Sequence, residues 1–173
     1  IESMYKKASK KKVGIVGCTL LYGNERDIQH AGIFLMPEGM ADHMYVRERY
    51  QTALKQVGSE KFPYDITKDM PMTAVTGAAQ LVRKSSFEKI GGFDEKFIIC
   101  GGDVDLCIRM NESGLQTWFV GGGYMLHKES ISRKFIPIPA EDFYNSYISY
   151  IKGYDPELGD PFLPEITKKI KIW

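Results

Sequence analysis

The 173-residue sequence lacks several features that would assign it to a specialised class of protein. It contains no apolar run long enough to span a bilayer and no signal-peptide pattern, so neither a membrane-spanning helix nor secretion is predicted. It also lacks an excess of one charge, because 23 basic side chains stand against 22 acidic ones. Without basic groups to spare for a phosphate backbone, the charge balance argues against nucleic acid as a partner.

Cysteine is scarce, and the three that occur (Cys18, Cys100 and Cys107) cannot all pair with one another. No two of them form a Cys-x-x-Cys pair, so neither a zinc site nor a thioredoxin-type redox motif is predicted. Free thiols in mostly apolar surroundings favour a reducing compartment, and we therefore expect a cytoplasmic protein.

The remaining composition is that of an ordinary globular protein, with 43% hydrophobic and 26% charged residues. The length suits one domain over residues 1–173, large enough for a core of its own. The first residue is Ile1. Either the initial methionine has been removed or the sequence is cut from a longer protein.

Apolar runs bounded by turn residues predict a series of short strands. Residues 13–18 and 30–35 are expected to form a hairpin with a long connection. Residues 73–82 alternate small and apolar side chains and are predicted to form a central strand. Two further strands are expected at 116–120 and 124–127, on either side of three glycines.

Three helices are predicted between and after these strands. The first follows a capping box, Ser85-Ser-Phe-Glu88, and ends at two glycines. The second covers 103–111, and the third covers 141–152, where an aromatic stripe at helical spacing is expected to face the core. Residues 45–57 fit either a short helix or an ordered loop. The mixture predicts an α/β fold, a mixed sheet flanked by helices.

The most informative motifs lie between Gly77 and Arg133. In order they are Gly77-Ala78-Ala79, Gly91-Gly-Phe-Asp-Glu95, Gly102-Asp-Val-Asp-Leu106 with Arg109 after it, and His127-Lys-Glu-Ser130. Their order and spacing resemble the C-terminal half of family 2 glycosyltransferases of the GT-A fold. Residues 13–35, with Gln29-His30-Ala-Gly32, are similar to the preceding region of rhamnosyltransferase-like members. Each motif alone is weak, but the set is specific.

The resemblance implies a partial GT-A (nucleotide-diphospho-sugar transferase) fold. Residues 1–173 would be its acceptor-side part, with the N-terminal nucleotide-binding part absent. The implied reaction moves a sugar from a nucleotide-sugar donor to a hydroxyl of a saccharide or lipid-linked saccharide acceptor in polysaccharide biosynthesis. It would be inverting and assisted by a divalent metal, Mn²⁺ or Mg²⁺. Association with the cytoplasmic face of a membrane is a further expectation.

Asp103 is the predicted catalytic base. An acceptor hydroxyl is a poor nucleophile at neutral pH, so a positioned carboxylate must take its proton. Gly101 and Gly102 precede Asp103 and leave space for a substrate, and the resemblance implies the same role for this aspartate. Gly102 stands where family members commonly have an acidic residue. The alternative is that Asp103 only caps the helix.

His127 is the predicted metal ligand, because the resemblance implies that a histidine here joins the metal site. The alternative is a histidine hydrogen-bonded at the end of a strand. Asp103 and Asp105 have the spacing of a metal-binding Asp-x-Asp, but they open a helix, and no apolar strand ends in such a motif. The donor-side metal motif is therefore predicted to be missing, and Asp105 is expected to pair with Arg109.

The other candidate residues would contact the substrates. Gly77 and Ala78 either leave room for a sugar or allow tight packing of the sheet. Arg133 could bind the diphosphate through two hydrogen bonds, although a surface arginine is the default interpretation. For the chain as a whole, the alternative to an enzyme is a non-catalytic carbohydrate-binding or scaffolding remnant of a glycosyltransferase.

Overall fold

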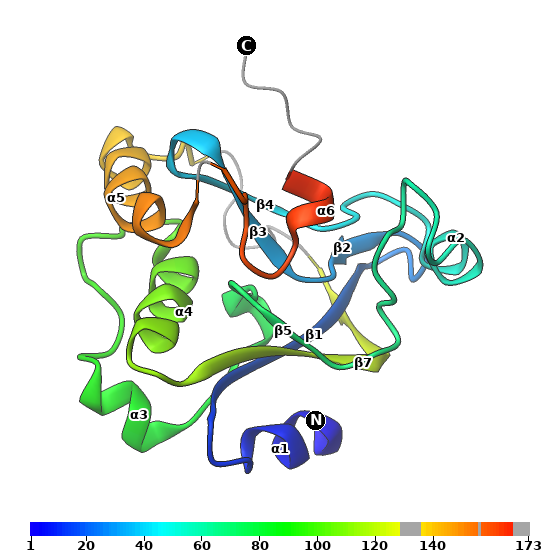
Figure 1. The fold of residues 1–173 in the computed structure, drawn as a ribbon, viewed down its shortest axis with the longest axis horizontal. Coiled ribbons are helices and arrows are strands. Elements are labelled where there is room, and N and C mark those ends of the chain that lie inside the picture. Colours follow the sequence, from blue (N-terminus) through cyan, green and yellow to red (C-terminus); the bar gives the residue numbers. More distant parts are fainter. Residues whose placement is uncertain (129–135, 156, 168–173) are drawn as a thin grey trace.

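The computed structural model describes residues 1–128, 136–155 and 157–167, and it shows a mixed sheet flanked by helices (Figure 1). The elements are α1 (Glu2–Ala8), β1 (Val13–Tyr22), β2 (Ile28–His30), β3 (Ile33–Met36), η1 (Pro37–Gly39), β4 (Met40–His43), α2 (Tyr50–Lys55), β5 (Met70–Met72), η2 (Gly77–Ala79), β6 (Leu81–Val82), α3 (Lys84–Lys89), α4 (Gly102–Glu112), β7 (Gln116–His127), α5 (Ala140–Tyr150), η3 (Ile151–Gly153) and α6 (Pro164–Thr167). Among these described helices, none is both long and apolar enough to cross a bilayer.

The main sheet has the strand order β2-β1-β7-β5, with β6 paired to β1 beside this path. Strands β1 and β7 run parallel, whereas the pairs formed by β2, β5 and β6 are antiparallel. Strands β3 and β4 form a separate two-stranded antiparallel ribbon. The predicted α/β class with a mixed sheet is confirmed.

Strand β1 is buried on both faces, which explains its unbroken apolar sequence. Side chains of a strand alternate between the two faces of a sheet. Ile15 and Leu21 accordingly point into the large core that contains the buried face of α4. Val16, Cys18 and Leu20 point into a smaller core with α1. In Figure 1, α1 lies on one side of the sheet, and α4 and the β3–β4 ribbon lie on the other.

Strand β7 is one long strand, where the sequence predicted two. Its register against β1 shifts at the three glycines, from Cys18 paired with Val120 to Thr19 paired with Tyr124. A side chain at Gly121 would collide with the backbone of Thr67, since its Cβ would lie closer to the Thr67 carbonyl than van der Waals contact allows. The glycines thus form an irregularity inside a strand and do not end it.

The predicted central strand over 73–82 is wrong at its middle. Residues 77–79 form a single 3-10 turn, η2, between the short strands β5 and β6. The Thr76 side chain accepts a hydrogen bond from the N–H of Ala78, and the N–H of Gly77 donates to the Asp103 carboxylate. Because side chains satisfy these backbone groups, the segment does not need strand partners.

The predicted hairpin is confirmed for β1 and β2, but residues 30–35 do not form one strand. The chain leaves the main sheet after His30 and enters the β3–β4 ribbon at Ile33. Gly32 between them has a φ of 115°, a backbone conformation that favours glycine. The ambiguous range 45–57 contains both proposed forms, since a looped segment precedes the short helix α2.

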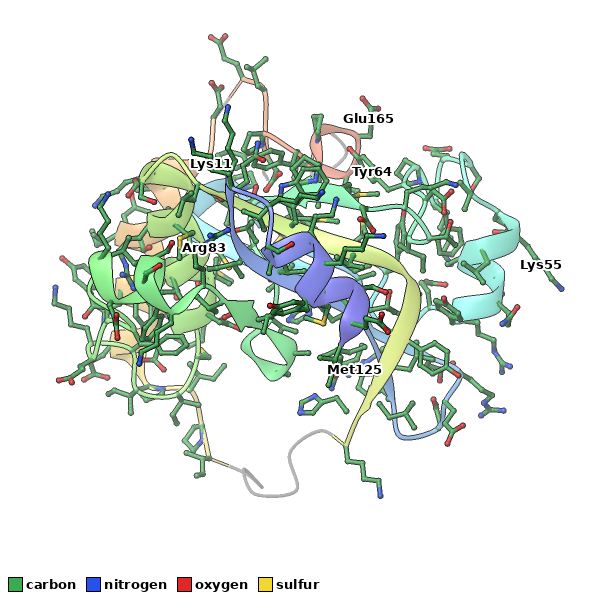
Figure 2. The ribbon with its side chains drawn as sticks, turned by 90° about the horizontal axis from the view of Figure 1, so that it is seen from below. Lys11, Lys55, Tyr64, Arg83, Met125 and Glu165 are labelled. Carbon is green, nitrogen blue, oxygen red and sulfur yellow. The ribbon has the colours of Figure 1, made fainter. Side chains whose placement is uncertain are left out.

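The predicted capping box at Ser85 is wrong, because the cap of α3 is Arg83, two residues earlier, and it makes no side-chain cap hydrogen bond. Arg83 instead joins β6 to the segment between α1 and β1 (Figure 2). Its Nη2 donates to the carbonyls of Ala8 and Lys10 at 2.8 and 2.6 Å, and its Nε donates to Val13 at 3.2 Å. The predicted end of α3 at Gly91, with φ 85°, is confirmed.

Helix α5 confirms the helix predicted at 141–152, but its aromatic stripe does not face the core. Phe143, Tyr144 and Tyr147 are 51%, 67% and 43% exposed. Only Asp142 and Tyr150 of this helix are fully buried. Its contacts with the rest of the fold are therefore made largely by hydrogen-bonding side chains.

The C-terminal segment is attached to β3 through the buried side chain of Asp160. Its carboxylate accepts hydrogen bonds from the backbone N–H groups of Leu35, Phe162 and Leu163 at 2.9, 2.8 and 2.9 Å. Burial raises the pKa of this carboxyl, and the hydrogen bonds act in the opposite direction. The three donors would have no acceptor if the carboxylate were removed.

We expect Asp160→Ala to lower the free energy of unfolding by about 3 kcal/mol, because a buried donor without a partner costs about 1–3 kcal/mol. Urea unfolding measures the loss. The matched control is Asp155→Ala, which removes an exposed carboxylate that accepts from the N–H groups of Glu157 and Leu158. The control should lose less than about 1 kcal/mol. Equal losses would contradict this role for Asp160.

Candidate active site

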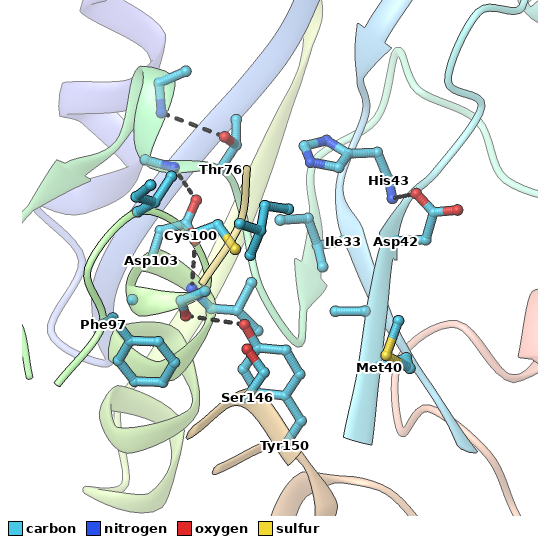
Figure 3. Close-up of a pocket in the computed structure, with 18 of the residues that line it drawn as sticks. Ile33, Met40, Asp42, His43, Thr76, Phe97, Cys100, Asp103, Ser146 and Tyr150 are labelled. Atoms are coloured by element: carbon cyan, nitrogen blue, oxygen red, sulfur yellow. Dashed lines mark hydrogen bonds between the residues drawn. The ribbon is translucent and has the colours of Figure 1, made fainter. Parts of the chain in front are cut away.

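A cavity of about 840 Å³ lies between the start of α4 and the β3–β4 ribbon. Figure 3 shows its two walls: Asp103, Phe97 and Tyr150 project from one side, and His43 projects from the other. His127, at the end of β7, also lines it. The fold therefore brings the predicted base and the predicted metal ligand to one cavity.

Asp103 is held in place by the backbone of η2. Its Oδ2 accepts a hydrogen bond from the N–H of Gly77 at 2.7 Å, and its Oδ1 accepts from the N–H of Val104 at 2.9 Å. The cap of α4 is Gly101, so Asp103 lies inside the first turn and is not the cap residue.

Gly77 and Ala78 were predicted to leave room for a sugar. A Cβ on Gly77 would lie 3.2 Å from Cβ of Asp103, so the space beside Gly77 is occupied by the aspartate. Ala78 lines the cavity beside it. The lack of a side chain at Gly77 thus allows Asp103 to approach the backbone closely enough for the hydrogen bond.

Gly101 and Gly102 allow the loop before Asp103 to pack closely against its neighbours. Gly101 has a φ of 92°, and a Cβ there would lie 2.7 Å from Oγ of Ser146 and 2.8 Å from Oη of Tyr150. The Tyr150 hydroxyl donates to the Gly101 carbonyl at 3.0 Å. Both glycines line the cavity, and Gly101 also joins the loop to α5; their contact with a substrate stays a prediction.

Asp142 of α5 fixes the preceding part of the same loop. Its buried carboxylate accepts from the backbone N–H groups of Ile98, Ile99 and Cys100 at 2.7, 2.8 and 2.9 Å. Burial alone would raise the pKa of Asp142, but the three N–H donors outweigh it and hold the pKa below its usual value. Asp142 is therefore ionised at neutral pH and stabilises the loop that leads to Asp103.

Asp105 forms the predicted ion pair with Arg109, with Nε and Nη2 of the arginine each 2.7 Å from Oδ2. The hydroxyl of Ser149 donates to the other oxygen of Asp105 at 2.7 Å, and Nη1 of Arg109 donates to the carbonyl of Ile90. The pair thus joins α4 to α5 and to the end of α3. The prediction that Asp105 has a structural role is confirmed.

His127 is oriented by Gln29 of β2. Nδ1 of His127 lies 2.7 Å from Oε1 of Gln29. An amide oxygen only accepts, so Nδ1 must donate, and Nε2 is the ring nitrogen left for a metal. This arrangement fits His127 as one metal ligand. Within residues 1–128, 136–155 and 157–167, however, no three His, Cys, Asp or Glu side chains form a group that could hold a metal ion.

The motifs did not reveal the whole site. Arg133 lies outside the described residues, so its predicted contact with a diphosphate stays a prediction. Sequence reasoning did not assign Phe97, Tyr150 or His43 to the site, although all three line the cavity. The only motif residue that could have pointed to His43 is His30. It belongs to the Gln29-His30-Ala-Gly32 motif and is a neighbour of His43 in the fold.

Known proteins resemble this chain in sequence and in fold. The family profile described as the N-terminal domain of galactosyltransferase matches residues 60–131. The O-antigen biosynthesis protein RfbC of Myxococcus xanthus is 34% identical over 169 residues, which are 96% of this chain and 12% of that protein. N-acetylglucosaminyl-diphospho-decaprenol L-rhamnosyltransferase of Mycobacterium tuberculosis is 34% identical over 64 residues, which are 37% of this chain and 21% of the relative.

Among solved structures, GalNAc-T7 with UDP, GalNAc and Mn²⁺ has a TM-score of 0.52 and 12% identity. The match covers 90% of this chain and 29% of that one, and at this identity it establishes the fold alone. The fold and the family profile define the class. The sequence matches a glycosyltransferase family, and the structure is part of a GT-A fold. Within that class its sequence relatives confirm the resemblance to rhamnosyltransferase-like family 2 members.

We expect Gly101→Ala to destabilise the protein more than Gly58→Ala, a matched control. Both glycines have a positive φ, 92° and 84°, but a Cβ at Gly58 would meet nothing within 4 Å. The control should lose about 1–2 kcal/mol from backbone strain. Gly101→Ala should lose about 2 kcal/mol more, because the added methyl must displace Tyr150 and Ser146. Urea unfolding of both variants measures the difference, and equal losses would show that the loop relaxes freely.

Proposed function

We propose that this chain forms the acceptor side of a glycosyltransferase active site, with Asp103 as the catalytic base. The observation that carries the proposal is the Asp103 carboxylate, held at 2.7 Å by the Gly77 N–H on the wall of an 840 Å³ cavity. The chain spans only 12% and 21% of the two relatives described above. The activity proposed is therefore that of a longer protein to which this chain contributes.

In the proposed reaction, an acceptor hydroxyl donates its proton to Asp103 while its oxygen attacks the sugar carbon of the donor. The bond between that carbon and the diphosphate oxygen breaks, and the diphosphate leaves with the electron pair. A single displacement of this kind inverts the configuration at the carbon. Two backbone N–H donors fix the orientation of the Asp103 carboxylate before the substrate arrives, which reduces the cost of positioning it.

The same cavity suits a sugar ring. Phe97 offers aromatic surface close to Asp103, and His43 offers a polar group across the cavity. Sites for small molecules commonly combine apolar walls with a few placed polar groups. We therefore assign Phe97 and the loop at Gly101 and Gly102 to the binding of the acceptor saccharide, with Tyr150 supporting the loop from behind.

A divalent metal, Mn²⁺ or Mg²⁺, would neutralise charge that develops on the leaving diphosphate. His127 is the residue of this chain that would hold it, because Gln29 engages Nδ1 and leaves Nε2 as the nitrogen available to a ligand. The other ligands and the nucleotide-binding residues would come from a part of the longer protein that precedes this chain. The role of this chain toward the metal is then to present one oriented imidazole.

The names of the relatives suggest the kind of substrate. One is an O-antigen biosynthesis protein, and another acts on N-acetylglucosaminyl-diphospho-decaprenol. We infer a nucleotide-sugar donor and a saccharide or lipid-linked saccharide acceptor, used in polysaccharide synthesis. The cytoplasmic location and the membrane association stay predictions from the sequence.

A second candidate function is a non-catalytic carbohydrate-binding remnant. Gly102 in place of the acidic residue common in the family favours it, since the loss removes a negative charge next to Asp103. In this alternative the cavity binds a saccharide, and the carboxylate of Asp103 acts only as a hydrogen-bond acceptor. The two functions differ in what happens when Asp103 loses its charge.

Asp103→Asn in the longest available protein distinguishes them. Transfer of L-rhamnose from its dTDP, UDP and GDP forms to N-acetylglucosaminyl-diphospho-decaprenol is the assay, because one relative is named for that acceptor. We expect a loss of about 10²- to 10⁴-fold in kcat, the usual contribution of a general base.

The matched control is Asp65→Asn, which changes a half-buried carboxylate that accepts hydrogen bonds from Thr67 and lies outside the cavity. It should leave the rate unchanged. Unfolding curves of both variants would separate a lost base from a damaged fold. Undiminished transfer by Asp103→Asn would remove the aspartate from the catalytic role.

A further inference from the structure

The entrance of the cavity carries apolar side chains that the reaction described above does not use. Five large apolar residues that line the cavity are between 43% and 63% exposed: Met40, Phe93, Ile98, Ile138 and Phe143. A residue that lines a cavity and is also exposed lies where the cavity meets the solvent. These five residues form what we call the apolar rim. They come from both walls, since Met40 lies across the cavity from the loop of Phe97 and Ile98 (Figure 3).

Hydrogen bonds from α5 hold one side of the apolar rim in place. The carboxylate of Asp142 accepts from the backbone N–H of Ile98 at 2.7 Å, and Phe143 is the next residue of the same helix. Asn145 donates to the carbonyl of Lys96 at 2.9 Å. Ile98 and Phe143 are therefore attached to each other through the backbone, while their apolar side chains are left at the entrance.

The positions of two further rim residues are also fixed. Met40 follows Gly39 of η1, and a Cβ on Gly39 would lie 2.5 Å from Cα of Tyr147. This part of the chain thus packs directly on α5. Phe93 packs edge-to-face on Phe87 of α3, with ring centroids 5.5 Å apart. The apolar rim is consequently formed before any ligand arrives.

The ligand that covers the apolar rim must leave the cavity accessible. Single exposed apolar residues are common on protein surfaces, whereas a group of them marks a binding surface. A second copy of the chain, or another domain, seated on residues from both walls would close the entrance and keep an acceptor away from Asp103. The ligand of the apolar rim therefore enters together with the acceptor, as a part of it.

The chemistry of the apolar rim indicates which part of an acceptor it suits. The side chains of isoleucine, methionine and phenylalanine offer no hydrogen-bond donor, and only the methionine sulfur is a weak acceptor. A further sugar ring laid against them would bury hydroxyl groups without partners, which costs free energy. An apolar chain has no such groups and is stabilised by the burial of its surface. The apolar rim thus favours a hydrocarbon chain over a second sugar.

We propose that the apolar rim binds the hydrocarbon chain of a lipid-linked acceptor where that chain leaves the cavity. The inference rests on the proposed function and selects one of the two acceptor classes given there. The acceptor sugar lies at Asp103, and the chain crosses Ile98 and Phe143 on its way out. Because this binding depends on the apolar area covered, the affinity for the acceptor rises with the length of the chain until the rim is covered.

The chain-length dependence is tested in the longer protein with two acceptors, N-acetylglucosaminyl diphosphate carrying either a farnesyl or a methyl group. Both are used with the L-rhamnose donors, below the concentration at which the farnesyl compound forms micelles. We expect the wild-type KM for the farnesyl compound to be at least about tenfold lower than that for the methyl compound. Ile98→Ser and Phe143→Ser should each reduce this ratio about 3- to 10-fold, because each removes apolar surface from the rim.

The matched control is Leu158→Ser. Leu158 is 63% exposed, as is Ile98, but it does not line the cavity. The control should keep the wild-type ratio of the two KM values. A wild-type ratio near one would overturn the proposal. So would an equal rise of both KM values in the Ile98 and Phe143 variants, since the rim would then act on the whole cavity and not on the chain.

Contact with the hydrocarbon chain is tested on this chain itself, by ¹H–¹³C correlation of the isoleucine and methionine methyl groups. The farnesyl compound should shift the methyl signals of Met40, Ile98 and Ile138, and the methyl compound should not. The reference is Ile148 of α5, which is 44% exposed and does not line the cavity. Unshifted rim signals, or an equal shift at Ile148, would overturn the proposal. This measurement needs no turnover, so it tests the rim whether or not Asp103 proves to be the base.

Discussion

The hydrogen bond from the Gly77 N–H to Oδ2 of Asp103, 2.7 Å long, joins two segments that lie 26 residues apart in the chain. One segment is a 3-10 turn between two short strands, and the other is the first turn of α4. A side chain on Gly77 would lie against Asp103, so the bond depends on glycine at that position. This hydrogen bond fixes the position of the Asp103 carboxylate on the cavity wall, and the other cavity residues lie around it.

Helix α5 holds the other side of this arrangement. Asp142 binds three consecutive N–H groups of the loop before Asp103, Tyr150 binds the carbonyl of Gly101, and Ser149 binds Asp105. The helix therefore positions the segment that carries Asp103 through polar contacts, while Phe143, Tyr144 and Tyr147 are left exposed. This explains why an aromatic stripe, which usually marks a core face, is misleading here.

The features that could be predicted from the sequence are those that depend on residues close together in the chain. The buried strand β1, the end of α3 at Gly91 and the Asp105–Arg109 pair each follow from residues close together in the chain. The turn at 77–79 could not be predicted, because small alternating residues are as compatible with a strand as with a turn. The turn is stabilised by the Asp103 carboxylate of α4, which accepts a hydrogen bond from the N–H of Gly77. The same is true of His43, which reaches the cavity because the β3–β4 ribbon folds over the site and which His30 contacts through its ring nitrogen.

The central claim is that this chain supplies the acceptor side of the site and that the nucleotide is bound elsewhere in a longer protein. Calorimetric titration with UDP, GDP and dTDP, each with and without Mn²⁺, tests it most directly. We expect no micromolar binding by this chain, and metal-dependent micromolar binding of one nucleotide by the longer protein. Metal-dependent micromolar binding by this chain alone would contradict the account, because the donor site would then lie within these residues.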